Sequence, residues 1–125
     1  MIKGIGVDMV YVHRMKRWRE ISGILERFFH REELSAALEE GSGADLSLAV
    51  RFAAKEAFGK ALGTGLRGIV LKDIMVKNRD NGQPELKVSG TALSALENCG
   101  AGKIHVSLTH ERDYAIAMVV LENEL

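Results

Sequence analysis

Cysteine, proline and long apolar runs are scarce in this sequence. It contains one cysteine, Cys99, and one proline, and no apolar stretch approaches the roughly 18 residues that a membrane helix needs. A single cysteine excludes an internal disulfide and a thiolate metal cluster, as is typical of a reducing compartment. The N-terminal residues MIKGIGVDMV lack the layout of a signal peptide. We therefore expect a cytoplasmic protein with no membrane span.

An excess of charge of one sign is also lacking, because 17 Lys and Arg balance 17 Asp and Glu. A zero total argues against a general nucleic-acid binder. The distribution is uneven, since residues 1–31 hold seven Lys and Arg against three acids, whereas residues 32–46 hold five acids and no Lys or Arg. The basic segment predicts a docking surface for an acidic protein partner.

The hydrophobic pattern predicts one domain, residues 1–125, with a core of its own, because 46% of the residues are apolar. Helical spacing dominates the first half and strand-like runs the second, which favours an α+β fold with a mostly antiparallel sheet and a long central helix. The strands are expected over 2–7, 69–77, 85–89, 104–109 and 114–122. The helices are expected over 10–18, within 22–40, from a cap at 42–45 to Gly63, and over 90–98, with hairpin turns at 80–82 and 110–113.

The central helix carries cations and a carboxylate on an alanine-rich segment, RFAAKEAFGKALGTG at residues 51–65. At about 3.6 residues per turn, Glu56 and Lys60 lie one turn apart on a face that differs from the apolar one. Gly63-Thr64-Gly65 supplies a C-terminal stop whose bare backbone can approach a phosphate closely. Taken alone, the segment favours a solvated helix face with ion pairs and a glycine cap.

Two carboxylates are candidates for a metal site. Asp8 follows the strand expected at 2–7, where it serves either as a helix N-cap or as a ligand for a hard metal ion. Glu56 is the natural second ligand, because it lies in a cationic, glycine-flanked helix. Two carboxylates are too few for a complete cage, but they suit Mg²⁺, which keeps waters and takes its other ligands from substrate phosphates.

Other residues have the chemistry to bind phosphate groups. The candidates for a diphosphate are Lys55, Lys60 and Arg51, together with Gly63, Thr64 and Gly65. The candidates for a phosphate or ribose at the end of a late strand are Ser107, Thr109 and His110. His105 lies five residues before His110, so the two imidazoles are expected on opposite faces of that strand.

Four segments together resemble a known family. They are GVDMVYVHRM at 6–15, FHREEL at 29–34, RFAAKEAFGKALGTG at 51–65 and HVSLTHERDYAIA at 105–117. The chain is similar along its length to the short bacterial class of 4′-phosphopantetheinyl transferases, the holo-[acyl-carrier-protein] synthases. The most specific feature is a G-x-D motif near the N-terminus paired with Phe52-Ala-Ala-Lys55-Glu56-Ala57 in the central helix.

The resemblance implies that the protein moves the 4′-phosphopantetheine arm of coenzyme A onto a serine of apo-acyl carrier protein, in support of fatty acid biosynthesis. By motif position, Asp8 and Glu56 would be the Mg²⁺ ligands, and Lys60 would lie along the diphosphate. The phosphoadenosine end would meet Arg51, Ser107, Thr109 and His110. The nucleotide pocket would be lined by Gly63, Thr64 and Gly65.

The resemblance also implies a half-domain of the transferase fold that forms a homotrimer with active sites at the subunit interfaces. Acyl carrier proteins are acidic, so the basic segment would dock them, with Arg14 ranked first and Arg17 beside it. Lys16, Arg19, Arg27 and Arg31 would add to the same surface. The general base stays open between Lys55, Glu56 and a metal-bound water polarised by Asp8, and we favour the water.

Two other functions are compatible with the same residues. One is a different Mg²⁺-dependent nucleotide transferase or diphosphohydrolase that uses Asp8 and Glu56 without a carrier protein. The other is a non-catalytic module whose basic helix docks an acidic partner. Substitution of Asp8 separates them, because it would abolish turnover in an enzyme and leave a docking module intact.

Overall fold

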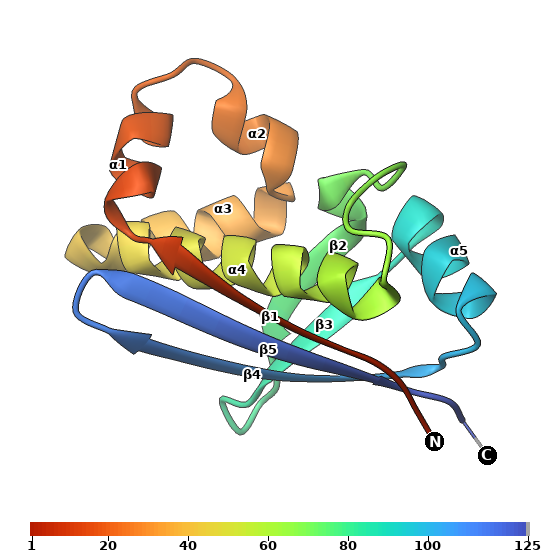
Figure 1. The fold of residues 1–125 in the computed structure, drawn as a ribbon. Helices are drawn as coiled ribbons and strands as arrows, with labels where there is room; N and C mark the ends of the chain where they lie inside the picture. Colours follow the sequence, from red (N-terminus) through yellow and green to blue (C-terminus); the bar gives the residue numbers. More distant parts are fainter. Residues whose placement is uncertain (125) are drawn as a thin grey trace.

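The computed structural model describes residues 1–124 and has the expected α+β architecture, with a long helix lying across an antiparallel sheet (Figure 1). The strands are β1 (Ile2–Tyr11), β2 (Ile74–Asn78), β3 (Pro84–Val88), β4 (Lys103–Glu111) and β5 (Tyr114–Glu122). The helices are α1 (His13–Arg19), α2 (Ile24–Phe28), α3 (Arg31–Leu38), α4 (Ala44–Leu62) and α5 (Gly90–Asn98), with short 3₁₀ turns η1 (Gly41–Gly43) and η2 (Leu71–Asp73). None of the helices in residues 1–124 is long and apolar enough to span a membrane.

β5 is the middle strand of a three-stranded antiparallel sheet, with β1 on one edge and β4 on the other. β2 and β3 form a separate antiparallel hairpin. Side chains alternate between the two faces of a strand, so each strand of the larger sheet has one face toward α4 and one away from it. On β5 the inward residues Ala115, Ala117, Val119 and Leu121 are fully buried.

Small residues allow α4 to lie very close to β1. A Cβ atom at Gly4 would collide with the backbone carbonyl of Ala61, and one at Gly6 would collide with that of Ala57. Because these neighbours are helix backbone, they have no side-chain freedom with which to make room. The glycines therefore set the spacing between β1 and α4, and Asp8 follows two residues later on the same face of the strand.

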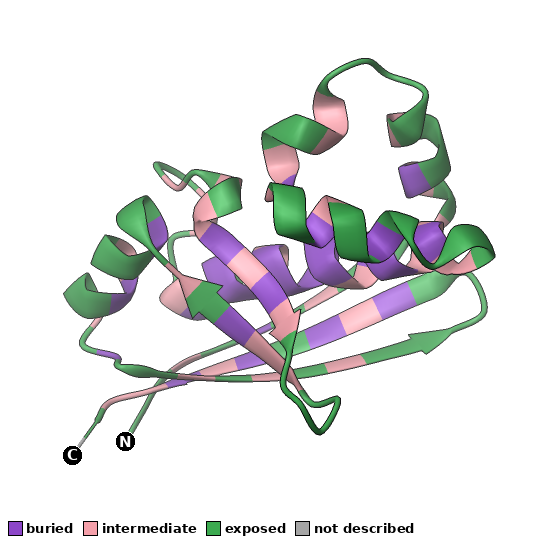
Figure 2. Ribbon diagram, turned by 180° about the vertical axis from the view of Figure 1, so that it is seen from behind, coloured by how far each residue is buried: buried purple, intermediate pink, exposed green. Residues whose placement is uncertain are grey.

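The other sides of α4 are covered by α1, α2, α3 and β2, so the helix is the centre of the core. An aromatic cluster joins it to the helices above, with ring centroids of Trp18 and Phe52 4.9 Å apart and those of Trp18 and Phe28 5.1 Å apart. Figure 2 shows buried positions running along α4 and alternating along β5. Because α4 is central, its charged side chains can reach solvent or a ligand only along the sides of the helix.

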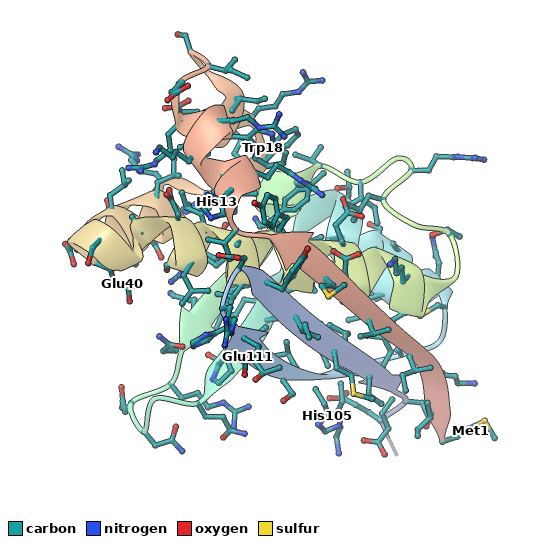
Figure 3. The ribbon with its side chains drawn as sticks, turned by 60° about the vertical axis from the view of Figure 1, so that its left-hand side comes forward. Met1, His13, Trp18, Glu40, His105 and Glu111 are labelled. Atoms are coloured by element: carbon teal, nitrogen blue, oxygen red, sulfur yellow. The ribbon has the colours of Figure 1, made fainter. Side chains whose placement is uncertain are left out.

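The face of the larger sheet that points away from α4 is apolar yet exposed, because all helices lie on the other side (Figure 1). The large apolar side chains exposed there are Ile5, Val7, Met9, Tyr11, Tyr114 and Met118. Strand register places Val7 opposite Met118 and Tyr11 opposite Tyr114, so the side chains form one continuous surface. His105 projects from β4 on this face (Figure 3) and pairs with Glu122, with Nε2 and Oε1 2.9 Å apart. We call this surface the outer sheet face.

Two expectations about element boundaries were wrong. β1 continues past Asp8 to Tyr11, because Met9, Val10 and Tyr11 pair with β5, so the first helix starts at His13 and not near residue 10. The cap of α4 does lie within 42–45, at Gly43, without a side-chain hydrogen bond, and Asp45 lies in the first turn and pairs with Arg19 at 2.8 Å.

The second wrong boundary concerns the strand expected over 69–77, which begins only at Ile74 because residues 71–73 form η2. The helix over 90–98 and the two late strands are confirmed, with both strands starting or ending close to the expected residues. The hairpin turn between those strands is shorter than expected, with Arg112 in the left-handed region at φ 53°.

Candidate active site

Asp8 and Lys60, 52 residues apart in the chain, meet where β1 crosses α4. The Lys60 ammonium donates to Asp8 Oδ1 at 2.9 Å and to the backbone carbonyl of Val7 at 3.1 Å. The Asp8 side chain is 16% exposed, whereas that of Lys60 is 54% exposed. Asp8 is therefore held against the helix by the close packing of β1, while Lys60 reaches it from the solvent side.

Glu56 belongs to the same cluster. Burial, and secondly the negative charge of Asp8, raise the pKa of Glu56 above its ordinary value, while Lys60 and Arg14 act in the opposite direction. Asp8 is thus near enough for its charge to disfavour ionisation of Glu56. Two carboxylates that repel each other favour a cation between them, because it would relieve that repulsion.

The donor chemistry of this pair fits a hard divalent ion. Carboxylate oxygens are the ligands that Mg²⁺ prefers, and a site with one or two carboxylates leaves positions for water and phosphate oxygens. Within residues 1–124, no group of three or more His, Cys, Asp or Glu side chains is arranged to hold a metal ion. The pair therefore resembles an open site completed by a substrate more than a closed structural cage.

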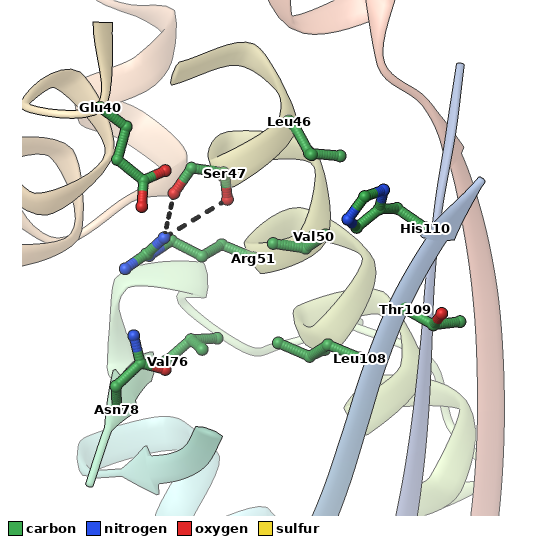
Figure 4. A pocket seen from close by; sticks show the side chains of 10 residues that line it. All are labelled: Glu40, Leu46, Ser47, Val50, Arg51, Val76, Asn78, Leu108, Thr109 and His110. Atoms are coloured by element: carbon green, nitrogen blue, oxygen red, sulfur yellow. Dashed lines mark hydrogen bonds between the residues drawn. The ribbon is translucent and has the colours of Figure 1, made fainter. Parts of the chain in front are cut away.

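A second cluster lies around Arg51, in a cavity of about 240 Å³ between α4, β2 and β4 (Figure 4). Its lining residues are Glu40, Leu46, Ser47, Val50, Arg51, Val76, Asn78, Leu108, Thr109 and His110. Apolar side chains such as Val50 and Leu108 lie in its middle, with Arg51 and Ser47 at one end and His110 at the other (Figure 4). This combination is typical of a small-molecule site, in which a few polar groups orient a ligand on an apolar surface.

The Arg51 guanidinium is the most distinctive group in the cavity. The residue is 9% exposed, and its Nη1 donates to the hydroxyl of Ser47 and, at 3.5 Å, to the Ser47 carbonyl. Its Nε has no hydrogen-bond partner among the described residues. A buried cation with an unsatisfied donor is costly unless an anion completes it, so this cavity favours a negatively charged ligand.

The two clusters lie on opposite flanks of α4. Arg51 and Glu56 are five residues apart, which places them about 140° from each other around the helix axis. Asp8 stands on β1 and His110 on β4, the two edges of the sheet. Within one chain, the helix therefore separates the carboxylate pair from the Arg51 cavity.

The expected ligand residues of β4 divide between the two faces of that strand. His110 pairs with the inward residue Ala115 and lines the Arg51 cavity. Thr109 also borders that cavity, but it pairs with Ile116 and its side chain therefore projects to the same face of β4 as Ser107, which does not line the cavity. Ser107 pairs with Met118 in the register and is exposed with the outer sheet face. The alternation of a strand thus separates residues that are close in sequence.

The glycine turn after α4 is a helix cap, as the conservative interpretation expected. Gly63 has φ 85° and its N–H bonds to the Lys60 carbonyl, so a left-handed residue ends the helix. Thr64 lines a different cavity, of about 590 Å³, beside α5 with Arg67 and Thr91. The turn does not line the Arg51 cavity.

Lys55 is not available to a ligand, which corrects the expectation that it neutralises a diphosphate or acts as a base. Its side chain is completely buried, and its ammonium donates to Glu33 at 2.7 Å and to the carbonyls of Leu71 and Ile74 at 3.0 and 2.6 Å. Burial lowers the pKa of Lys55, against the opposing attraction of the Glu33 carboxylate. All three ammonium donors are thus used inside the protein.

Glu33 is the buried partner of Lys55 and was not identified from the sequence. It also accepts hydrogen bonds from the N–H groups of His30 and Val76, at 3.0 and 3.1 Å, so it ties α3 to β2 as well as to α4. The sequence did contain both charged groups, a carboxylate in the segment FHREEL and a lysine in the central helix, from which the pair could have been predicted. The long separation in sequence concealed their pairing.

Helix α1 places a basic surface next to the carboxylate pair. Arg14 lies close enough to influence Glu56, and the last turn of the helix carries Lys16, Arg17 and Arg19. Lys16 and Arg17 are exposed, whereas Arg19 is bound to Asp45. The expected docking residues are therefore adjacent to the expected metal ligands.

Comparison with known sequences identifies one superfamily. The family model described as the 4′-phosphopantetheinyl transferase superfamily matches residues 4–119. The holo-[acyl-carrier-protein] synthase of Treponema denticola is 57% identical over 98% of this chain and 99% of its own length. That of Treponema pallidum strain Nichols is 48% identical, covering 99% of this chain and 98% of the relative.

Solved structures agree with the sequence relatives. A holo-(acyl-carrier-protein) synthase from Bacillus anthracis in complex with CoA (3′,5′-ADP) superposes with a TM-score of 0.83 and 35% identity, covering 99% of both chains. The enzyme of Neisseria meningitidis gives a TM-score of 0.86 at 39% identity, covering 98% of this chain and all of the other. The Helicobacter pylori enzyme in complex with coenzyme A gives 0.80 at 27% identity, covering 94% and 99%.

Proposed function

The chain belongs to the 4′-phosphopantetheinyl transferase superfamily, and we propose how its own residues carry out the reaction of the holo-[acyl-carrier-protein] synthases in it. It is an enzyme that transfers the 4′-phosphopantetheine group of coenzyme A to acyl carrier protein. The observation that carries the assignment of the site is the meeting of Asp8, Glu56 and Lys60 on one flank of α4, beside basic helix α1.

Asp8 and Glu56 are assigned as the ligands of Mg²⁺. Their hard oxygen donors and mutual repulsion support this choice, as does the absence, within residues 1–124, of a third nearby carboxylate or imidazole that would close the site. A bound Mg²⁺ would neutralise charge on the diphosphate of coenzyme A and make its phosphorus more electrophilic.

Lys60 is assigned to the diphosphate. In the transfer, the hydroxyl oxygen of the carrier serine bonds to the phosphorus that bears the pantetheine arm, and the bond from that phosphorus to the bridging diphosphate oxygen breaks. The serine proton leaves toward the carboxylate cluster, and adenosine 3′,5′-bisphosphate departs with the negative charge. An ammonium beside the departing oxygens stabilises that charge as it develops. The nucleophile belongs to the partner, so this chain needs none of its own.

The Arg51 cavity is assigned to the phosphoadenosine end of coenzyme A. The unpartnered Nε of buried Arg51 supports a phosphate there, and the His110 imidazole adds a polar group beside apolar residues. Thr109 borders the same cavity from the end of β4. Ser107 and the Gly63-Thr64-Gly65 turn do not line this cavity, so they are assigned no contact with this end of coenzyme A.

We propose a homotrimer with active sites between subunits, and two features support contact between copies of this chain. The carboxylate pair and the Arg51 cavity lie on opposite flanks of α4, so one coenzyme A molecule reaches both most simply when they come from different subunits. The outer sheet face supplies the contact surface, because a continuous patch of exposed Ile, Val, Met and Tyr side chains is typical of an interface.

The carrier protein is assigned to helix α1. Arg14 and Arg17 would attract an acidic surface and bring its serine to the neighbouring carboxylate pair. The proposed setting is the cytoplasm, and the proposed role is to supply holo-acyl carrier protein for fatty acid synthesis.

The experiment is intact-mass measurement of an apo-acyl carrier protein after incubation with the protein, coenzyme A and Mg²⁺. We expect a gain of one phosphopantetheine, its loss with EDTA, and its loss with Asp8→Asn. Asp80→Asn in the β2–β3 turn is the matched control and should retain activity, because Asp80 is exposed and belongs neither to the carboxylate pair nor to the lining of the Arg51 cavity. Hydrolysis of nucleotide without any gain of mass on the carrier would favour the diphosphohydrolase alternative.

A further inference from the structure

Lys60 binds Asp8, a carboxylate for which a metal ion would compete. Its ammonium is in turn a group for which a diphosphate would compete. Its ammonium is bound to Asp8 at 2.9 Å and to the Val7 carbonyl at 3.1 Å, although more than half of the side chain is exposed to solvent. The partner carboxylate is the more buried of the two groups. The mobile member of the pair is therefore the lysine.

The charges of the cluster determine which ligand it attracts while Lys60 contacts Asp8. Asp8 and Glu56 bring two negative charges, which are offset by Lys60, in direct contact with Asp8, and by Arg14, which lies near Glu56. The metal-free cluster therefore has no surplus positive charge for a diphosphate, and its two carboxylates attract a divalent cation. Once a divalent ion joins the carboxylates, the same three side chains with the ion carry a net positive charge, and a diphosphate is attracted.

We propose that Lys60 is a displaceable counter-ion, which holds Asp8 while no metal is bound and moves to the diphosphate when a divalent cation takes the carboxylate pair. This inference rests on the proposed function, since it needs Asp8 and Glu56 to be the metal ligands. It adds an order of events: the metal binds first, the lysine is released, and coenzyme A binds a site that has become net positive. Metal and coenzyme A then strengthen each other's binding by the same factor, as linkage requires.

The test measures Mn²⁺ binding by the loss of the free-ion electron paramagnetic resonance signal, without coenzyme A or carrier. In Lys60→Met, the ammonium that competes for Asp8 is gone, so we expect Mn²⁺ to bind about three- to tenfold more tightly than in the unmodified protein. Lys60→Arg keeps the positive charge and should stay within about twofold of the unmodified protein. Lys103→Met, which removes an exposed lysine at the start of β4, is the matched control and should change nothing.

A second measurement is the dissociation constant of coenzyme A with and without Mn²⁺. The metal should improve binding by a larger factor in the unmodified protein than in Lys60→Met, because only the former gains a freed lysine. Equal Mn²⁺ affinity in the unmodified protein and Lys60→Met would overturn the proposal, as would an equal effect of the metal on coenzyme A binding. Unchanged Mn²⁺ affinity in Asp8→Asn is a different failure, because it would remove the metal assignment itself.

Discussion

Substitution of Lys55, the buried lysine next to the proposed metal ligand Glu56, separates a structural role from a chemical one. Lys55→Met keeps the length and apolar stem of the side chain but leaves Glu33 without its cation and two carbonyls without a donor. Both members of the pair are completely buried, and removal of one partner from a buried ion pair costs about 3–5 kcal/mol. For a chain of 125 residues, each kcal/mol corresponds to roughly 4 °C in melting temperature, so the expected loss is roughly 12–20 °C.

The assay combines thermal unfolding with transfer activity measured at about 15 °C, where the variant should remain folded. We expect Lys55→Met to keep kcat within about threefold of the unmodified enzyme, because its ammonium is completely buried and its three donors are all used inside the protein. Lys60→Met should show the converse, with little change in melting temperature and a large loss of kcat. Replacement of both partners, Glu33→Gln with Lys55→Met, should cost less than the sum of the two single substitutions.

Two results would refute this reasoning. A fall in melting temperature of less than about 4 °C in Lys55→Met would mean that the buried pair contributes little to stability. A folded Lys55→Met enzyme that has lost a hundredfold or more in kcat would mean that the lysine takes part in the chemistry. Should Lys55→Met not fold, Glu33→Gln offers a milder version of the same test, since the amide keeps part of the hydrogen bonding.

Three further predictions concern the carboxylate pair and its surroundings. Gly6→Ala should lower stability by about 1–3 kcal/mol and weaken Mn²⁺ binding, measured by denaturant unfolding and by electron paramagnetic resonance, because the new Cβ pushes β1 and Asp8 away from the Ala57 carbonyl. Glu56→Gln should stabilise the metal-free protein at neutral pH while abolishing transfer. Because folding raises the pKa of Glu56, ionisation of this group lowers the stability of the protein as the pH rises through its unfolded and then its folded pKa. The stability gained in Glu56→Gln should therefore vanish below the pKa that Glu56 has in the unfolded chain. Arg14→Ala should raise KM for the carrier protein and reduce its dependence on salt, with KM for coenzyme A nearly unchanged.

The fold was largely predictable because its elements follow simple periodic patterns. The apolar spacing of α4 and its glycine stop gave the central helix its correct end at Leu62. The strands β4 and β5 were predicted from apolar runs around a polar turn. The boundaries that were wrong depend on tertiary contacts, such as the pairing of residues 9–11 with β5 that overrides a helical pattern.

The carboxylate pair was also predictable, although Lys55 was not. The pattern of the central helix placed Glu56 and Lys60 on one face, and the glycines before Asp8 are consistent with the close approach that brings it there. Nothing in the local pattern reveals that the flank bearing Lys55 is covered by α3 and β2. Its burial depends on Glu33, 22 residues away, and so on contacts that periodicity does not encode.

The residues of β4 give a similar lesson. A hydroxyl at Ser107 and an imidazole at His110 were grouped because they are neighbours in sequence, yet strand alternation sends them to opposite faces. The division of the site between the two flanks of α4 was not visible in the sequence either, because it depends on which edge of the sheet each strand occupies.

Complementation between two inactive variants is the most direct test of a transferase site shared between subunits. Asp8→Asn disables the carboxylate pair and Arg51→Ala disables the cavity, so each variant alone should be inactive in the mass assay, whether or not it forms the proposed homotrimer. In mixed trimers formed from equal amounts, a site that takes Asp8 from one chain and Arg51 from its neighbour is intact in about one case in four. We predict recovery of about a quarter of the unmodified activity. No recovery in trimers shown to be mixed would contradict a shared site.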